Sequence, residues 1–187
     1  RETITLRNNM GETALPMREL GSFKPGEIVG GTAAHWGCNA RRFLPYDFEI
    51  RSRMEARHGK NFFPEDCTSQ DWGVTYDELE PYYDQFEHIY GVGGKAGNLN
   101  GEIHPGGNPF EGARSREFPN PQTRRTPSGE LFAKAAESLG YTPFQGPAAA
   151  MTPDYTNLYK QFLGECQRGG FCSSHVCSRR IVCDTTR

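Results

Sequence analysis

The pattern of apolar and polar positions predicts two helices in a chain that is otherwise irregular. The first falls within residues 75–90, where apolar side chains recur at helical spacing and share one face: Tyr82, Phe86 and Ile89. Thr75 and Glu78 form a capping-box pattern at its start, and Gly91 is placed to end it. Because proline is not tolerated deep in a helix, we expect a short first turn and then a helix that begins near Pro81.

The second helix is predicted over residues 127–139. Pro127 suits its first position and Gly140 its end. The apolar stripe of this helix consists of Leu131, Ala135 and Leu139. Elsewhere the pattern predicts only a weak strand over residues 3–6 and a short helical turn over residues 48–57.

Two long segments, residues 91–125 and 141–165, have no clear period. Loops of such length in a compact domain are usually functional or disordered. The chain of 187 residues contains 22 Gly and 13 Pro, whereas Ile, Leu, Val and Phe together make up less than about a fifth of it, a share associated with poor core formation. We therefore expect loops and short helices laid over something else: a missing domain, a partner or a large cofactor.

Charge and hydropathy exclude several function classes. The formal net charge of −2 gives no electrostatic basis for binding nucleic acid or an anionic membrane. There is no run of about 18 apolar residues that could cross a membrane, and no basic and apolar leader that indicates a signal peptide. The chain begins with Arg1, which indicates a processed, trimmed or partial sequence.

Residues 30–36, with the sequence Gly-Gly-Thr-Ala-Ala-His-Trp, carry the first candidate chemistry. Adjacent glycines let a backbone approach a ligand closely and turn N–H groups toward an anion. The two alanines leave room for a flat molecule, and the imidazole and indole offer a reactive nitrogen and a stacking surface. The alternative is an ordinary turn before a buried aromatic residue, because short glycine motifs often match by chance.

Residues 91–96, Gly-Val-Gly-Gly-Lys-Ala, formally match a dinucleotide-binding fingerprint. They follow a predicted helix instead of a strand, and the Asn, Pro and Gly residues after them deny the helix that such a site needs. We therefore assign no nucleotide to them.

Four of the six cysteines lie within residues 166–187: Cys166, Cys172, Cys177 and Cys183. Structural thiols, an iron–sulfur cluster, a zinc site and disulfides all remain open as interpretations. The two-residue gaps that are usual in zinc sites are absent.

Several motifs together resemble the glucose–methanol–choline (GMC) oxidoreductases, in particular the branch with gluconate, fructose and sorbitol dehydrogenase flavoproteins and pyranose oxidases. The likeness covers roughly residues 1–177. Its motifs are Gly-Gly-Thr-Ala-Ala-His-Trp-Gly at 30–37, Asp-Trp-Gly-Val-Thr-Tyr at 71–76, Glu-Pro-Tyr-Tyr at 80–83, Asn-Pro-Phe-Glu-Gly at 108–112 and Arg-Ser-Arg-Glu-Phe-Pro at 114–119.

The resemblance implies a site for the flavin of FAD, with these contacting residues: Gly30, Gly31, Thr32, Ala33, His35, Trp36 and Asn39. In pyranose oxidases the His that matches His35 is bonded covalently to the flavin. Here Ala34 stands where those enzymes have Thr, so a covalent link rests on His35 and Trp36 alone.

The resemblance also implies an iron–sulfur cluster on Cys166, Cys172 and Cys177, which in relatives relays electrons from flavin to a cytochrome subunit. Gly169 stands where the family has a further Cys, so three thiolates remain, enough for a three-iron cluster. The run after Cys177 departs from the family.

The implied parent is an α/β flavoprotein with a Rossmann-like FAD-binding domain and a substrate domain, and the chain is an internal, loop-rich fragment with two clear helices and few strands. Residues 1–74 would belong to the FAD-binding domain, 75–165 to a helical and loop segment of the substrate or lid region, and 166–187 to a cysteine-rich segment. The fragment would lack the dinucleotide fingerprint and the catalytic His, so no catalytic residue is assigned and the fragment alone is expected to be inactive.

The implied reaction is hydride transfer from a sugar or polyol alcohol to flavin. The resemblance implies cytochrome and small subunits as partners, with no nucleic acid and no direct membrane insertion, and the periplasmic side of the inner membrane as the location. The alternatives are a non-enzymatic cysteine-rich metal-binding module and an oxidase without the cluster.

Overall fold

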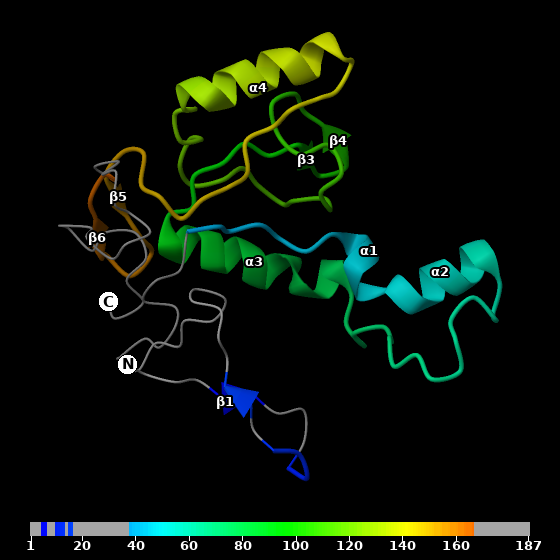
Figure 1. Ribbon diagram of the computed structural model, residues 1–187. Coiled ribbons are helices and arrows are strands. Elements are labelled where there is room, and N and C mark those ends of the chain that lie inside the picture. The colour runs from blue at the N-terminus through cyan, green and yellow to red at the C-terminus, as the bar shows by residue number, and fades with distance from the viewer. Residues whose placement is uncertain (1–4, 7–9, 14, 17–37, 167–187) are drawn as a thin grey trace.

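Helix α3 (Tyr76–Tyr90) is the element around which the other parts are arranged (Figure 1). The computed structural model describes residues 5–6, 10–13, 15–16 and 38–166. An extended segment, residues 38–44, runs beside α3 and leads into α1 (Pro45–Phe48) and α2 (Ile50–His58). The chain then returns through α3, a long irregular stretch and α4 (Pro127–Ser138).

Strands in the described residues are short antiparallel pairs: β1 (Thr5–Leu6) with β2 (Leu15–Pro16), β3 (Asn98–Leu99) with β4 (Glu102–Ile103), and β5 (Tyr155–Thr156) with β6 (Phe162–Leu163). The predicted strand over residues 3–6 is thus present at its second half. A loop-rich chain with few strands is confirmed for the described part.

Single-residue bridges join four separate segments near the middle of the molecule. Asn39 pairs with Ala148, Ala148 with Gly93, and Gly93 with Asn120. A small apolar core lies against this ladder: Cys38, Ala40, Val92, Phe118 and Ala149. The ladder therefore fixes residues 38–40 relative to the end of α3.

The α3 helix is continuous through Pro81, so the prediction that it begins near Pro81 is wrong. The capping box explains this: the Thr75 N–H donates to the Glu78 carboxylate at 2.7 Å, and the Glu78 N–H donates to the Thr75 hydroxyl at 3.3 Å. Pro81 deprives only the Asp77 carbonyl of a helical partner, and both residues are exposed to water. The first turn is thus stable enough to continue past the proline.

The apolar face of α3 that the sequence predicts is not the buried face of the helix. Tyr82 is 67% exposed, Phe86 is 37% exposed and Ile89 is half-buried. The buried residues of α3 are Tyr76, Asp84 and Glu87. The side of α3 that packs inward therefore consists largely of acidic side chains, which need cationic partners.

The predicted second helix is confirmed as α4, and Gly140 beyond it has a left-handed φ of +80°. Its apolar stripe does not pack inward: Leu131 is 69% and Leu139 74% exposed, and Ala133 is the buried residue. The short helical turn predicted over residues 48–57 is instead divided at Glu49 into α1 and α2.

Residues 91–125 are ordered by backbone hydrogen bonds, although the stretch has little regular structure. The N–H groups of Gly93 and Gly94 donate to Ala148 and Asn120 at 2.8 and 3.0 Å, and that of Ala96 donates to the Glu117 carboxylate at 2.6 Å. These donors therefore have partners within the protein.

A close backbone crossing within this stretch predicts a large cost for any added side chain. A Cβ at Gly107 would overlap the backbone N of Gly97. Gly107→Ala should therefore lower the free energy of unfolding by about 1–3 kcal/mol, as measured by urea denaturation. The control is Gly129→Ala, where a Cβ would meet the Thr126 hydroxyl at 3.3 Å and no backbone atom. Equal losses in the two variants would contradict the prediction.

Candidate functional site

A carboxylate buried between two guanidinium groups is the centre of the inward face of α3. Arg42 donates from Nε and Nη2 to the two carboxylate oxygens of Glu87, each at 2.9 Å. Arg114 donates to the same oxygens, from Nη1 at 3.3 Å and from Nη2. The side chains are 3% exposed for Arg42, 1% for Glu87 and 0% for Arg114. The three residues form an ion cluster that is almost fully withdrawn from water.

Arg42 has further partners that complete its hydrogen bonding. Its Nη1 donates to the Tyr76 hydroxyl and to the Glu80 carboxylate, both at 3.0 Å. The Tyr76 hydroxyl in turn donates to the Gly112 carbonyl at 3.2 Å. Burial disfavours the charged guanidinium, but the hydrogen bond and the charge of Glu87 outweigh it and raise the pKa of Arg42 above its usual value. Arg42 is thus a permanent cation.

Arg114 links the cluster to the stretch after α3. Its guanidinium lies 3.7 Å from the centre of the Phe118 ring, a cation–π contact. Among the described residues its Nε is buried without a hydrogen-bond partner. Nearby, burial raises the pKa of Glu111, while the Gly97 N–H and the charge of Arg114 act in the opposite direction. The ion cluster therefore connects residues 38–44, α3 and the 97–118 region.

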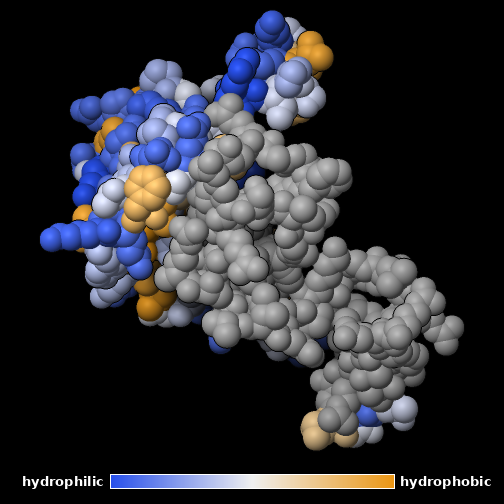
Figure 2. Space-filling model, turned by 90° about the vertical axis from the view of Figure 1, so that its left-hand side faces the viewer, coloured by the Kyte–Doolittle hydropathy of each residue, from blue (hydrophilic) through white to orange (hydrophobic). Residues whose placement is uncertain are grey.

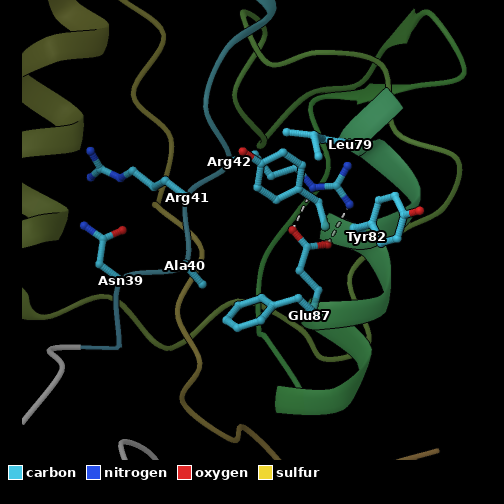
Figure 3. Close-up of a pocket in the computed structure, with 9 residues that line it drawn as sticks. Asn39, Ala40, Arg41, Arg42, Leu79, Tyr82 and Glu87 are labelled. Carbon is cyan, nitrogen blue, oxygen red and sulfur yellow. Dashed lines mark hydrogen bonds and ion pairs between the residues drawn. The ribbon is translucent and has the colours of Figure 1, made fainter. Parts of the chain in front are cut away.

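A hollow of about 410 Å³ lies between the extended segment and α3 (Figure 3), lined by Asn39, Ala40, Arg41, Arg42, Leu79, Tyr82, Tyr83, Phe86 and Glu87. Figure 3 shows Arg42 directed toward Glu87, whereas Asn39 and Arg41 point away from α3. This alternation is typical of an extended backbone. One face of the segment is thus bound to the helix, and the other carries Asn39 and Arg41.

Apolar side chains reach the surface of the described part at several places, among mostly hydrophilic ones (Figure 2). The large ones that are more than 60% exposed are Met10, Tyr82, Phe110, Leu131, Phe132, Leu139, Tyr141, Leu158, Tyr159 and Phe162. This agrees with the expectation, from composition, of a chain that does not enclose its own apolar residues.

Of the residues assigned to a site from the sequence, Asn39 and Cys166 lie in the described part. The others lie outside it: Gly30, Gly31, Thr32, Ala33, His35, Trp36, Cys172 and Cys177. The backbone of Asn39 is fixed by its bridge to Ala148; the residue is among those that line the hollow, while its side chain points away from α3. The backbone N–H of Cys166 donates to Met151 at 3.0 Å, and its side chain is half-buried.

The donor set around Cys166 is incomplete for a cluster within the described part of the chain. No group of three or more His, Cys, Asp or Glu residues there could hold a metal ion. An iron–sulfur site would have to draw its other ligands from residues beyond 166, so the metal ligands remain a prediction. The division of the chain into residues 1–74, 75–165 and 166–187 likewise remains a prediction.

Sequence reasoning missed the ion cluster. Glu80, which the sequence analysis assigned to no interaction, accepts from Arg42 and from the Ser115 N–H, the latter at 3.0 Å. The signal was available: Glu80, Tyr83 and Glu87 recur at the same helical spacing as the aromatic residues. An acidic helix face can be predicted to be buried only if the cations that pair with it are known. Here these cations, Arg42 and Arg114, lie far from Glu87 in the sequence.

The ion cluster predicts a large effect of removing its shared carboxylate. Glu87→Ala leaves Arg42 and Arg114 buried without their main partner and should lower the free energy of unfolding by about 3–5 kcal/mol, as measured by urea denaturation. The control is Glu49→Gln, which breaks an exposed pair with Arg53 and should cost less than about 1 kcal/mol. A Glu87→Ala variant as stable as this control would refute the interpretation.

A second ion pair on α3 predicts a specific pH dependence. Burial alone would raise the pKa of Asp84, but hydrogen bonds from Arg116 and the charge of His88 lower it. Asp84 therefore binds a proton more readily in the unfolded chain, where its pKa is about 3.9, than in the folded protein. Ionised Asp84 stabilises the fold above about pH 3.9, and this stabilisation is lost as the pH falls through the lower pKa of the folded state. Asp84→Asn should therefore be less stable than the parent at neutral pH.

The two proteins should converge in stability in acid, as measured by chemical denaturation across the pH range. Asp66→Asn, at an exposed turn, is the control and should follow the parent throughout. A stability difference between the parent and Asp84→Asn that stays constant down to about pH 3 would contradict the assignment.

Among the described residues, no helix is both long and apolar enough to cross a membrane.

Comparison with known proteins relates the chain to several enzymes. No protein-family model matches it. It is 43% identical over 180 residues to the gluconate 2-dehydrogenase flavoprotein of Pantoea cypripedii, a match that covers 95% of this chain and 29% of the relative. It is 32% identical over 139 residues to the fructose dehydrogenase large subunit of Gluconobacter japonicus, which covers 72% of this chain and 21% of the relative.

A third relative is an oxidase, the 6'''-hydroxyparomomycin C oxidase of Streptomyces lividus, which is 29% identical over 149 residues; this match covers 80% of the chain and 23% of the relative. The chain thus spans less than a third of the length of each of these curated relatives. Over most of its own length, the chain is related to part of a group of dehydrogenases and oxidases that includes a flavoprotein.

Proposed function

We propose that the chain is part of an FAD-dependent oxidoreductase of the GMC type that acts on CH–OH groups of sugars or polyols. The observation that carries this proposal is the 43% identity, over 95% of the chain, to a gluconate 2-dehydrogenase flavoprotein. The similarity to a fructose dehydrogenase subunit supports the same class of substrate. Because the chain spans only part of these relatives, the catalytic base would belong to polypeptide beyond it.

The role of this chain in the proposed enzyme is to form one wall of the flavin site. The contacting residues would be Gly30, Gly31, Thr32, Ala33, His35, Trp36 and Asn39. The chemistry that a bound flavin supplies is acceptance of a hydride from the alcohol carbon. What supports the assignment in the structure is Asn39: it borders a hollow and stands on a segment fixed by backbone pairing to Ala148.

We propose further that Cys166, Cys172 and Cys177 hold an iron–sulfur cluster through which electrons leave the enzyme to a cytochrome subunit. Thiolates from a short irregular run are the usual ligands of such clusters. The protein would work with partner subunits on the periplasmic side of the inner membrane. Gluconate and fructose are the substrates in the names of two relatives, and a sugar or polyol is the class proposed here.

The proposal predicts a flavin that sugars or polyols reduce. The complete protein in which this sequence occurs should show flavin absorption after purification, and gluconate, fructose or sorbitol should bleach it in the absence of oxygen. If His35 is the covalent attachment site, the flavin should stay with the denatured parent protein and be released from denatured His35→Ala. A purified protein that binds zinc and no flavin would refute the proposed function and support the metal-binding alternative.

A further inference from the structure

We infer that Arg42, through its ion pair with Glu87, is a positioning residue that sets the place of Asn39 in the flavin site. This inference rests on the proposed function, because Asn39 is a flavin contact only there. Arg42 itself touches neither flavin nor substrate in this assignment. Its effect would pass along the extended backbone that joins it to Asn39.

The extended segment is held from two sides, and Arg42 supplies one of them. On one side its backbone pairs with residues 147–149: the Ala40 N–H donates to Pro147 at 3.2 Å, and the Ala149 N–H donates to Cys38 at 2.8 Å. On the other side the Arg42 side chain reaches α3. The backbone pairing holds residues 38–40 beside residues 147–149, and the Arg42 contact holds the following part of the segment against α3.

The Arg42 contact limits how far the segment can rotate about its own axis, and in this inference it thereby refines the direction in which Asn39 points. Side chains alternate along an extended backbone, so Asn39 and Arg42 lie on opposite faces, as Figure 3 shows. The two residues are three positions apart, a span of about 10 Å at about 3.3 Å per residue. A guanidinium bound in bidentate geometry has a defined plane and position, whereas an ammonium group at the same place would bind as a point charge. Arg42→Lys should therefore keep the charge and lose the orientation.

Glu87 is a suitable anchor because it lies on the best-supported turn of α3. The carbonyl groups of the last residues of the helix accept side-chain hydrogen bonds from later parts of the chain: Tyr155 donates to His88 at 2.8 Å, and Asn157 donates to Ile89 at 3.0 Å. Asn120 donates to the carbonyl of Gly91, the residue directly after α3, at 2.7 Å. The end of α3 is thus fixed independently of Arg42.

The same helix carries a matched control. The Arg116 guanidinium binds Asp84 in bidentate geometry, with distances between 2.6 and 2.9 Å. Asp84 is one helical turn before Glu87, and the hydrogen bonds between Arg116 and Asp84 do not involve residues 38–44; the charge of Arg42 acts on Asp84 only from a distance. Arg116→Lys therefore perturbs an ion pair of α3 and leaves the hydrogen bonds of the segment that carries Asn39 in place.

The test compares Arg42→Lys with Arg116→Lys in the complete protein. In the Arg42→Lys variant we expect the visible circular dichroism of the flavin to change and kcat/KM for a sugar or polyol to fall on the order of 100-fold, since a displacement of about 1 Å far from the reacting atoms can cost that much. In Arg116→Lys both should match the parent. The visible spectrum reports the surroundings of the flavin and is insensitive to a general loss of stability.

A second variant decides the question if Arg42→Lys does not fold. Glu80→Gln removes the negative charge of one of the two carboxylates that bind Arg42 and keeps the Glu87 pair, and the inference predicts the same spectral change at smaller size. Parent-like spectra and kcat/KM in the folded Arg42 and Glu80 variants would overturn the inference, as would equal changes in Arg116→Lys. If the parent protein holds no flavin, the proposed function itself is refuted. This result differs from the two outcomes above, which would overturn only the inference about Arg42.

Discussion

The ion pairs of Glu87 decide how the described part of this chain is built. A buried carboxylate is costly unless cations and hydrogen bonds satisfy it, and here both cations come from remote segments: Arg42 before α3 and Arg114 after it. Their geometry fixes where each segment crosses the helix. Few alternative arrangements would satisfy all three charges, so the cluster selects one arrangement of segments that have little secondary structure to define them.

Much of the local structure could be predicted from the sequence, because its signals are local. The ends of α4 and the capping box of α3 follow from neighbouring residues. The course of α3 through Pro81 could not, since it depends on how strongly Thr75 and Glu78 hold the first turn. The order in residues 91–125 depends on pairing with Ala148 and Asn120, which periodicity does not report.

The inward face of α3 is the clearest case in which sequence pattern and structure differ. Aromatic residues at helical spacing usually indicate a buried face, yet Tyr82 lies outside and Glu87 inside. The usual rule assumes that a helix packs against its own domain. In its relatives, the part that matches this chain makes up less than a third of the length. That part therefore has other polypeptide to pack against there. The exposed stripe of α4, with Leu131 and Leu139, fits the same explanation.

A polar interior of this kind also bears on the candidate site. Apolar side chains tolerate many packings of similar free energy, whereas a bidentate guanidinium–carboxylate pair has one geometry. In the proposed enzyme, a fixed geometry of the segment that carries Asn39 would matter more than added stability, because hydride transfer depends on alignment. Since the composition of the chain supplies few aliphatic residues, ion pairs are the interaction by which a fixed geometry can be achieved here. The charged face of α3 would serve that proposed role.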